Sequence, residues 1–209
     1  MSPLSNFTDP NLDEKELEKL LETGEFPKKT LIPTTLIGSK IIVFNNIYAA
    51  ILYGFGRYFG IPVGIRKPKG HIFTKPLELT LFEALYLLKN KKIDIILKQS
   101  EKKLSEKEFY QFACDNYPAF DDKYRIYEDL REKKYIPRPG QKFGADFIVY
   151  RKGPGIDHSS FCIQVLANHS KIGSIDVVRS ARLATSVKKK FIMANPLTKS
   201  YFSFKWYKP

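Results

Sequence analysis

The pattern of hydrophobic and polar positions predicts helices that alternate with short β-strands. Residues 81–92 repeat their hydrophobic side chains at helical spacing, and Thr80 with Glu83 form a Thr-x-x-Glu capping box in front of them. Ser105 and Glu108 form a second box of this kind in front of another amphipathic run. We therefore expect one helix to begin after Thr80 and another to begin after Ser105.

The rest of the first half contains less regular patterns. Residues 11–24 read as a short helix that ends at Gly24. The stretch from there to about Lys69 reads as strands and turns, with residues 39–46 (SKIIVFNN) as a β-rich run and several glycines suited to tight turns. These glycines miss the G-x-G-x-x-G spacing, so the sequence does not predict a dinucleotide-binding loop.

Pro118 marks the predicted boundary between an N-terminal domain, residues 1–116, and a C-terminal domain, residues 117–209. The second domain begins with an amphipathic helix in residues 121–135 and continues into a turn in residues 136–141. The elements expected after that turn are strands in residues 145–151, 160–166, 190–194 and 201–207, and a helix in residues 174–187. The predicted class is therefore α/β (α+β), with a small mixed N-terminal domain followed by a β-rich module.

Charge narrows the choice of partner. Lys and Arg number 35 against 22 Asp and Glu, so the net charge of +13 favours a polyanion, with nucleic acid ahead of a membrane. No apolar run approaches the roughly 18 to 20 residues of a spanning helix, and the first residues are polar and acidic, unlike a signal peptide. We expect a soluble, intracellular protein in which Cys114 and Cys162 are reduced.

One loop combines residue types that can cleave RNA without a metal. Tyr150 and His158 stand eight positions apart, at the two ends of the loop between two predicted strands, and Lys188–Lys190 follow downstream. Such cleavage needs a base for the ribose 2′-hydroxyl, an acid for the departing 5′-oxygen and a cation beside the phosphate. Arg151 and Lys152 favour the ionised form of a neighbouring tyrosine. Spacing alone leaves open that these are an ordinary strand end, a turn residue and a helix C-terminus.

Two segments, GADFIVYRKGPGIDHSSFCIQV and RSARLATSVKKKFIMA, resemble the catalytic domain of archaeal and eukaryotic tRNA-splicing endonucleases. The resemblance is good over residues 117–209 and covers residues 1–110 only in general layout. It implies a central mixed β-sheet flanked by helices, with Tyr150 as general base, His158 as general acid and Lys189 as transition-state stabiliser. Lys188 is the alternative to Lys189. On a strand, residues 188 and 190 would point to the face opposite to residue 189, so only one of the two sets can reach the phosphate.

The same resemblance implies a reaction, namely excision of introns from precursor tRNA at a bulge-helix-bulge fold. The expected products carry a 2′,3′-cyclic phosphate and a 5′-hydroxyl, and the expected enzyme needs no metal or other cofactor. A metal-dependent nuclease fits poorly, because Asp146 is followed on the next strand by Gln164 rather than by a paired acid. His71 and His169 lack companions that could complete a metal site. The residues expected to bind RNA are Arg151, Lys152, Lys188, Lys190 and Trp206, although Trp206 could equally pack a terminal strand or a subunit interface.

Assembly is predicted from the absence of acidic residues in one region. Residues 177–209 contain no Asp or Glu, whereas the resemblance implies an acidic loop between the last strands that joins subunits of homotetrameric relatives. We therefore expect a heterotetramer of two copies of this chain and two copies of a distinct subunit that supplies the acidic loop. Two other functions stay open, a non-catalytic RNA-binding or scaffolding subunit of the same assembly and an unrelated basic RNA-binding protein. The expected location is the cytoplasm if the organism is archaeal.

Overall fold

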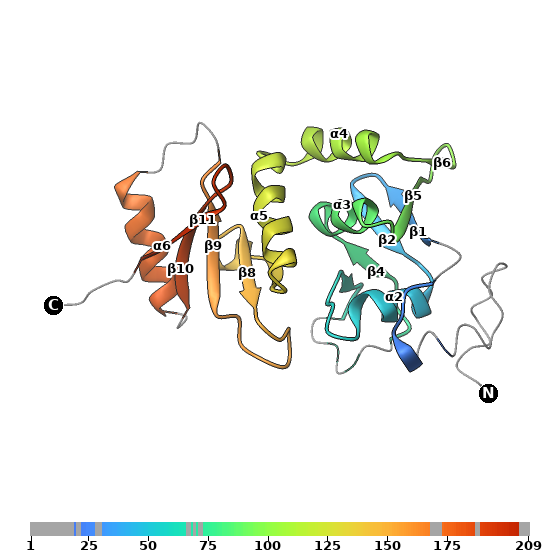
Figure 1. The fold of residues 1–209 in the computed structure, drawn as a ribbon, viewed down its shortest axis with the longest axis horizontal. Helices are drawn as coiled ribbons and strands as arrows, with labels where there is room; N and C mark the ends of the chain where they lie inside the picture. Colours follow the sequence, from blue (N-terminus) through green and yellow to red (C-terminus); the bar gives the residue numbers. More distant parts are fainter. Residues whose placement is uncertain are drawn as a thin grey trace. The chain divides into compact units, whose positions relative to one another are not determined.

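The chain divides into two compact units, residues 1–116 (unit 1) and residues 117–209 (unit 2), each with its own β-sheet (Figure 1). The structure is a computed structural model. It describes residues 19, 22–27, 31–65, 68, 70, 73–167, 173–186 and 189–204. Within these residues no helix is long and apolar enough to cross a membrane.

Unit 1 contains a mixed sheet whose strands lie in the order β3-β4-β2-β1-β5-β6. The pair of β1 and β5 is parallel, and the other neighbouring strands are antiparallel. The strands are β1 (Ile32–Ile37), β2 (Lys40–Val43), β3 (Ile61–Pro62), β4 (Leu77–Leu79), β5 (Ile93–Leu97) and β6 (Lys102–Lys103). The helices of this unit are α2 (Asn46–Tyr53), α3 (Leu81–Lys89) and α4 (Glu106–Asn116).

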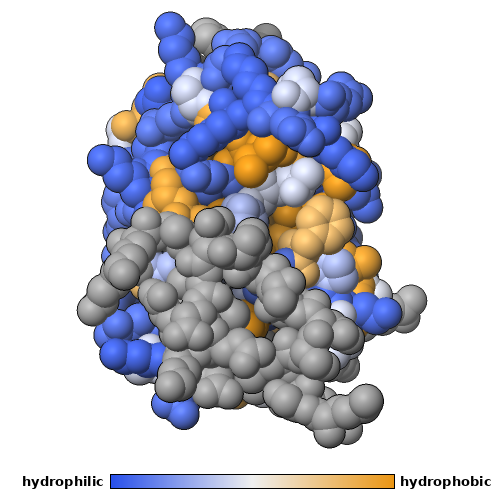
Figure 2. Space-filling model, turned by 90° about the vertical axis from the view of Figure 1, so that its right-hand side faces the viewer, coloured by the Kyte–Doolittle hydropathy of each residue, from blue (hydrophilic) through white to orange (hydrophobic). Residues whose placement is uncertain are grey.

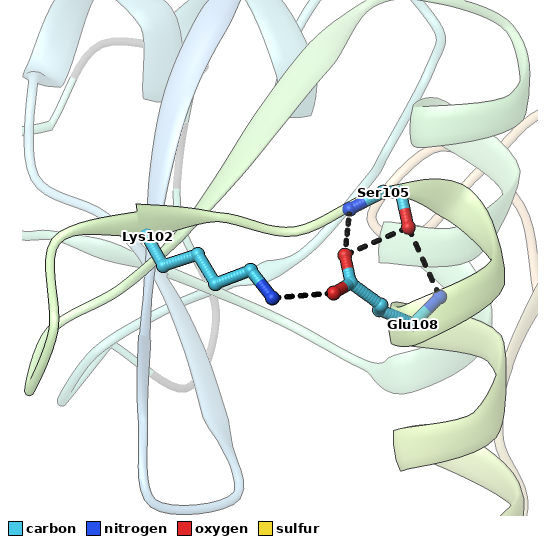
Figure 3. Close-up of polar contacts among 3 residues, drawn as sticks. All are labelled: Lys102, Ser105 and Glu108. Carbon is cyan, nitrogen blue, oxygen red and sulfur yellow. Dashed lines mark hydrogen bonds and ion pairs between the residues drawn. The ribbon is translucent and has the colours of Figure 1, made fainter.

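Both predicted capping boxes are confirmed. At the start of α3 the Thr80 hydroxyl accepts the Glu83 N–H, and the Glu83 carboxylate accepts the Thr80 N–H at 2.8 Å. At the start of α4 Glu108 accepts the N–H of Ser105 at 2.9 Å and its hydroxyl at 2.7 Å, and Lys102 adds an ion pair (Figure 3). The bonds from Lys102 and Ser105 lower the pKa of Glu108 to about 2.

Helix α2 corrects the prediction of strands and turns up to Lys69. Asn45 caps this helix, because its side chain accepts the N–H groups of Ile47 and Tyr48. Every residue from Ile47 to Tyr53 is buried. A helix that is buried all round has no polar stripe, so its sequence is a continuous apolar run that resembles a buried strand.

The helix predicted in residues 11–24 falls mostly outside the described residues. Lys19, Glu22 and Thr23 are helical, and Gly24 follows them at a φ of +65°. A β-carbon at Gly24 would lie 2.3 Å from the ring of Phe55, so both conformation and space favour glycine at this position.

Part of the surface of unit 1 is apolar. Phe44 is 54% exposed and Ile61 is 43% exposed. Figure 2 shows hydrophobic residues at the surface of one side of the molecule, bordered by hydrophilic ones.

Unit 2 contains a second mixed sheet, with strands in the order β11-β10-β9-β8-β7. The pair of β9 and β10 is parallel and the other pairs are antiparallel. The strands are β7 (Ile136–Pro139), β8 (Phe147–Tyr150), β9 (Phe161–Val165), β10 (Lys190–Asn195) and β11 (Ser200–Phe204). The helices are α5 (Phe120–Glu132), the short 3-10 helix η1 (Gln141–Phe143) and α6 (Ser174–Ser186). Two mixed sheets with helices confirm the predicted α/β class.

Strand β7 is a second correction, since residues 136–141 were expected to form a turn. Ile136 pairs with Tyr150 and Pro137 with Val149, so β7 forms an antiparallel ladder with β8. Because β7 is an edge strand, its two prolines can leave their missing N–H groups on the side without a neighbour. Sequence alone does not reveal which strand lies at the edge.

The two faces of the unit 2 sheet carry different side chains. On one face Ile148, Cys162, Phe191 and Met193 form a buried cluster, against which Val177 of α6 packs. On the other face the ring of Phe147 lies 6.0 Å from that of Tyr127 on α5. Helices α5 and α6 therefore pack on opposite faces, and the cluster on the α6 side is called the α6-side core below.

Candidate active site

Tyr150 is the last residue of β8 and is half-buried. Two positions before it, Ile148 belongs to the α6-side core, and Tyr150 packs against the same cluster. Alternation along β8 thus directs the tyrosine to the α6 side of the sheet. The loop that follows ends where the N–H of Ser160 donates to the carbonyl oxygen of Val149 at 3.0 Å.

Asp157 holds this loop closed. Its carboxylate accepts the backbone N–H groups of Arg151 at 3.1 Å, Lys152 at 3.1 Å and Gly153 at 2.9 Å. The residue before His158 is therefore hydrogen-bonded to the residue that follows Tyr150. Sequence reasoning missed this role, although an aspartate in a glycine-rich turn is a recognisable signal for such bonds.

The ionisation of Asp157 matches this role. Partial burial raises the pKa of the carboxyl group, but the N–H groups of Gly153, Lys152 and Arg151 outweigh that effect and lower the pKa below its ordinary value. The carboxylate form thus closes the loop at neutral pH. His158 itself is exposed, between Asp157 and the buried Ser159.

Lys189 reaches the other end of the same loop. Its Nζ donates to the carbonyl oxygen of Ser159 at 2.8 Å and to the hydroxyl oxygen of the same residue, and lies 5.3 Å from the centre of the Phe143 ring. Lys189 stands two positions before Phe191 of the α6-side core, on the side of the sheet that carries Tyr150. Burial raises the pKa of the Cys162 thiol in that core, and the charge of Lys189 partly opposes the rise.

The other predicted RNA-binding residues do not all lie on the α6 side of the sheet. Lys190 begins β10 and is exposed, and Lys152 is exposed in the loop. Arg151 is exposed too, but its guanidinium lies 5.5 Å from the ring of Phe161, which faces the α5 side because Phe161 pairs with Val149. Lys188 and Trp206 lie outside the described residues.

Asp146 has its oxygens engaged by neighbouring groups. One oxygen lies 2.9 Å from Nζ of Lys123, and the other accepts the Gln164 side chain at 2.7 Å and the Val165 N–H at 2.8 Å. This pattern is typical of a structural anchor. In the part of the chain that the structure describes, no group of three His, Cys, Asp or Glu side chains could hold a metal ion. His71 and His169 lie outside that part.

Comparison with known families gives this geometry its context. Residues 120–201 match the model of the tRNA intron endonuclease catalytic C-terminal domain, and residues 32–110 match that of its N-terminal domain. The chain belongs to the tRNA intron endonuclease family. Tyr150, His158 and Lys189 all fall inside the segment matched to the catalytic domain. This endonuclease is accordingly an endoribonuclease of tRNA splicing.

Three relatives illustrate the extent of the similarity. The tRNA-splicing endonuclease of Hyperthermus butylicus is 37% identical over 86% of this chain and 100% of its own length. That of Saccharolobus solfataricus is 36% identical over 85% of this chain and 100% of its own length. That of Sulfurisphaera tokodaii is 38% identical over 83% of this chain and 97% of its own length. The similarity therefore spans both units of this endonuclease.

Proposed function

We propose that this endonuclease excises introns from precursor tRNA at bulge-helix-bulge folds and leaves a 2′,3′-cyclic phosphate and a 5′-hydroxyl. The observation that carries the proposal is the contact of Lys189 with Ser159, beside His158, at the end of the sheet where Tyr150 leaves β8. A tyrosine, a histidine and a lysine thus lie near one end of one sheet in the catalytic domain, and this arrangement supports the proposal.

The proposed chemistry assigns one step to each side chain. Tyr150, as phenolate, accepts the proton of the ribose 2′-hydroxyl, and the freed oxygen attacks the adjacent phosphorus to form the cyclic phosphate. The bond from phosphorus to the 5′-oxygen breaks, and His158 in its protonated form donates a proton to that oxygen. Lys189 stabilises the negative charge that develops on the non-bridging oxygens.

The contacts of Lys189 suit this task. An ammonium group has three N–H donors, and two of them are directed to Ser159. One donor is then left for a phosphate oxygen, while the bonds to Ser159 limit the rotamers that the long side chain can adopt. A preorganised charge of this kind needs little rearrangement as the reaction proceeds.

The decisive experiment incubates the chain with a bulge-helix-bulge RNA in EDTA, alone and together with a family subunit that carries an acidic loop. From the mixture with the partner subunit we expect cleavage that survives chelation and leaves cyclic phosphate ends. This cleavage should be lost in Tyr150→Phe and His158→Ala. Activity that is abolished by EDTA and restored by magnesium would contradict the proposal. RNA binding without cleavage by either preparation would instead support a non-catalytic or unrelated RNA-binding protein.

We further propose that the active assembly is a heterotetramer of two copies of this chain and two of a partner subunit. The turn between β10 and β11 contains Lys199 and no carboxylate, and Leu197 at this turn is 60% exposed. Strand β11 is an edge strand whose Phe202 is 51% exposed, so it offers both backbone groups and an apolar side chain to a neighbour. A partner with an acidic loop would complement the cationic C-terminal region.

Light scattering tests this assembly. We expect the chain alone to be weakly active or inactive, and a partner subunit with an acidic loop between its last strands to produce a two-plus-two complex with full activity. A stable homotetramer with full activity would show that the missing carboxylates are not needed.

The proposal also includes RNA contacts by five side chains, namely Arg151, Lys152, Lys188, Lys190 and Trp206. Affinity measurements on single alanine variants test these contacts.

A further inference from the structure

We infer that Asp157 and Ser159, the two residues that flank His158, are positioning residues. They hold the proposed base, acid and cation in fixed positions relative to one another. This inference rests on the proposed function. It concerns side chains that do not themselves touch the reacting atoms, and it explains how a solvent-exposed histidine in a loop can have a defined position.

Asp157 connects His158 to the end of β8. Three hydrogen bonds of 2.9 to 3.1 Å join its carboxylate to the backbone of Arg151, Lys152 and Gly153, which follow Tyr150 directly. Gly153 also accepts the N–H groups of Ile156 and Asp157, each at 3.1 Å. Bonds from backbone N–H groups to a charged carboxylate are among the stronger hydrogen bonds, so this end of the loop is firmly closed.

Ser159 connects His158 to the proposed cation. Its side chain is buried, with 5% of the residue exposed, and both its carbonyl and its hydroxyl oxygen accept from Nζ of Lys189. The next residue, Ser160, donates its N–H to Val149 and accepts the N–H of Lys190, which ties the chain to β8 and β10. The exposed histidine therefore lies between Asp157, which is bonded to the backbone that follows Tyr150, and Ser159, which is bonded to Lys189.

The consequence for catalysis is geometric. Consecutive α-carbons are about 3.8 Å apart, so a shift at residue 157 or 159 moves His158 by a similar amount. A misplacement of about 1 Å in a reacting group can reduce a rate by about 10²-fold. Loss of either anchor should therefore lower the rate of the chemical step and leave RNA affinity nearly unchanged.

The test measures single-turnover cleavage and RNA affinity for Asp157→Ala, Asp157→Asn and Ser159→Ala in the complete assembly. We expect Asp157→Ala and Ser159→Ala to lose about 10- to 100-fold in the rate at saturating RNA, with affinity within about threefold of wild type. Asp157→Asn should lose less, because its amide oxygen can still accept from Arg151 and Lys152 although its NH₂ group cannot accept from Gly153.

Matched controls are Ser160→Ala and Asp115→Asn, which remove a neighbouring hydroxyl and a surface carboxylate. Both are expected to cleave at the wild-type rate. Circular dichroism and thermal unfolding of every variant report whether the fold is retained. If Asp157→Ala does not fold, Asp157→Asn and Ser159→Ala still carry the test.

Double variants separate positioning from general scaffolding. If Ser159 acts through Lys189, Ser159→Ala should cause no further loss in a Lys189→Ala background, and Asp157→Ala should likewise cause none in a His158→Ala background. Losses that add in full, or wild-type rates for all three single variants, would overturn the inference. Failure of the wild-type enzyme to cleave in EDTA would instead contradict the proposed function.

Discussion

Asp146 allows a prediction that separates a structural carboxylate from a catalytic one. In the structure this side chain joins α5 to β9, because it contacts Lys123 at 2.9 Å, the Gln164 amide at 2.7 Å and the Val165 N–H at 2.8 Å. The Asp146 and Lys123 side chains are only 9% and 18% exposed. Asp146→Ala removes the partner of a largely buried cation and two further hydrogen bonds.

The magnitude follows from this environment. Hydrogen bonds to a charged group contribute about 1.5 to 3 kcal/mol each, but three of them on one carboxylate do not add in full because burial of the charge opposes them. Removing one partner of a buried ion pair costs about 3 to 5 kcal/mol. We expect the free energy of opening of unit 2 around β8 and β9 to fall by that amount.

Hydrogen exchange at the amides of residues 147–165 measures this effect locally. Where exchange requires opening of the sheet, a loss of about 3 to 5 kcal/mol makes exchange faster by about 10²- to 10⁴-fold. Cleavage measured below the unfolding transition should change by less than about tenfold and stay resistant to EDTA. Asp115→Asn on the surface of α4 is the control and should alter neither quantity.

Two outcomes would refute this reasoning. A cleavage rate that collapses in Asp146→Ala while exchange stays at the wild-type level would make Asp146 part of the chemistry. Independent losses of stability in Asp146→Ala and Lys123→Met, additive in the double variant, would show that the two side chains do not act as a pair.

The remaining predictions concern the proposed catalytic residues and the half-buried Tyr201. His158→Ala should lose about 10²- to 10⁴-fold in the chemical step with normal RNA affinity, and Lys189→Ala should lose more than Lys188→Ala; the reverse order would assign the cation to Lys188. Tyr201→Phe removes a hydrogen bond to buried Asp129, so the free energy of unfolding should fall by about 1 to 3 kcal/mol at neutral pH. Burial, the hydrogen bond and the charge of Asp129 raise the pKa of Tyr201. The contribution is therefore complete below about pH 10, the ordinary pKa of tyrosine, and is lost progressively as the pH rises from there toward the raised pKa of the folded state. The gap between the melting temperatures of Tyr201→Phe and wild type should therefore narrow as the pH rises above about 10, and a constant gap would contradict the sign.

The starts of helices α3 and α4 were determined locally and could be predicted from sequence. The boxes at Thr80 and Ser105 consist of bonds between residues three positions apart, so their signal is present in the local sequence. Strands β8 and β9 were likewise predictable, because each is a short apolar run next to a loop with glycine and proline. Local sequence thus determined where Tyr150 and His158 lie along the chain.

Helix α2 and strand β7 depended on tertiary structure. Seven of the eight residues of α2 are buried, so its pattern carries no helical period that could distinguish it from a strand. The prolines of β7 are compatible with a strand only because β7 lies at the edge of its sheet. In both cases the deciding factor is what surrounds the segment, and a single sequence does not contain that information directly.

The surroundings of Lys189 show the same division most clearly. The sequence shows three consecutive lysines and the expected strand after them. It does not show which of residues 188 and 189 faces the α6 side of the sheet, because that depends on the register of the strand. The contact between Lys189 and Ser159 joins residues 30 positions apart and forms because β10 pairs in parallel with β9 after α6. A slip of one residue in that pairing would turn Lys189 to the opposite face. Composition and local pattern therefore determined which residue types were available, and the long-range pairing of two strands brought Lys189 into contact with Ser159.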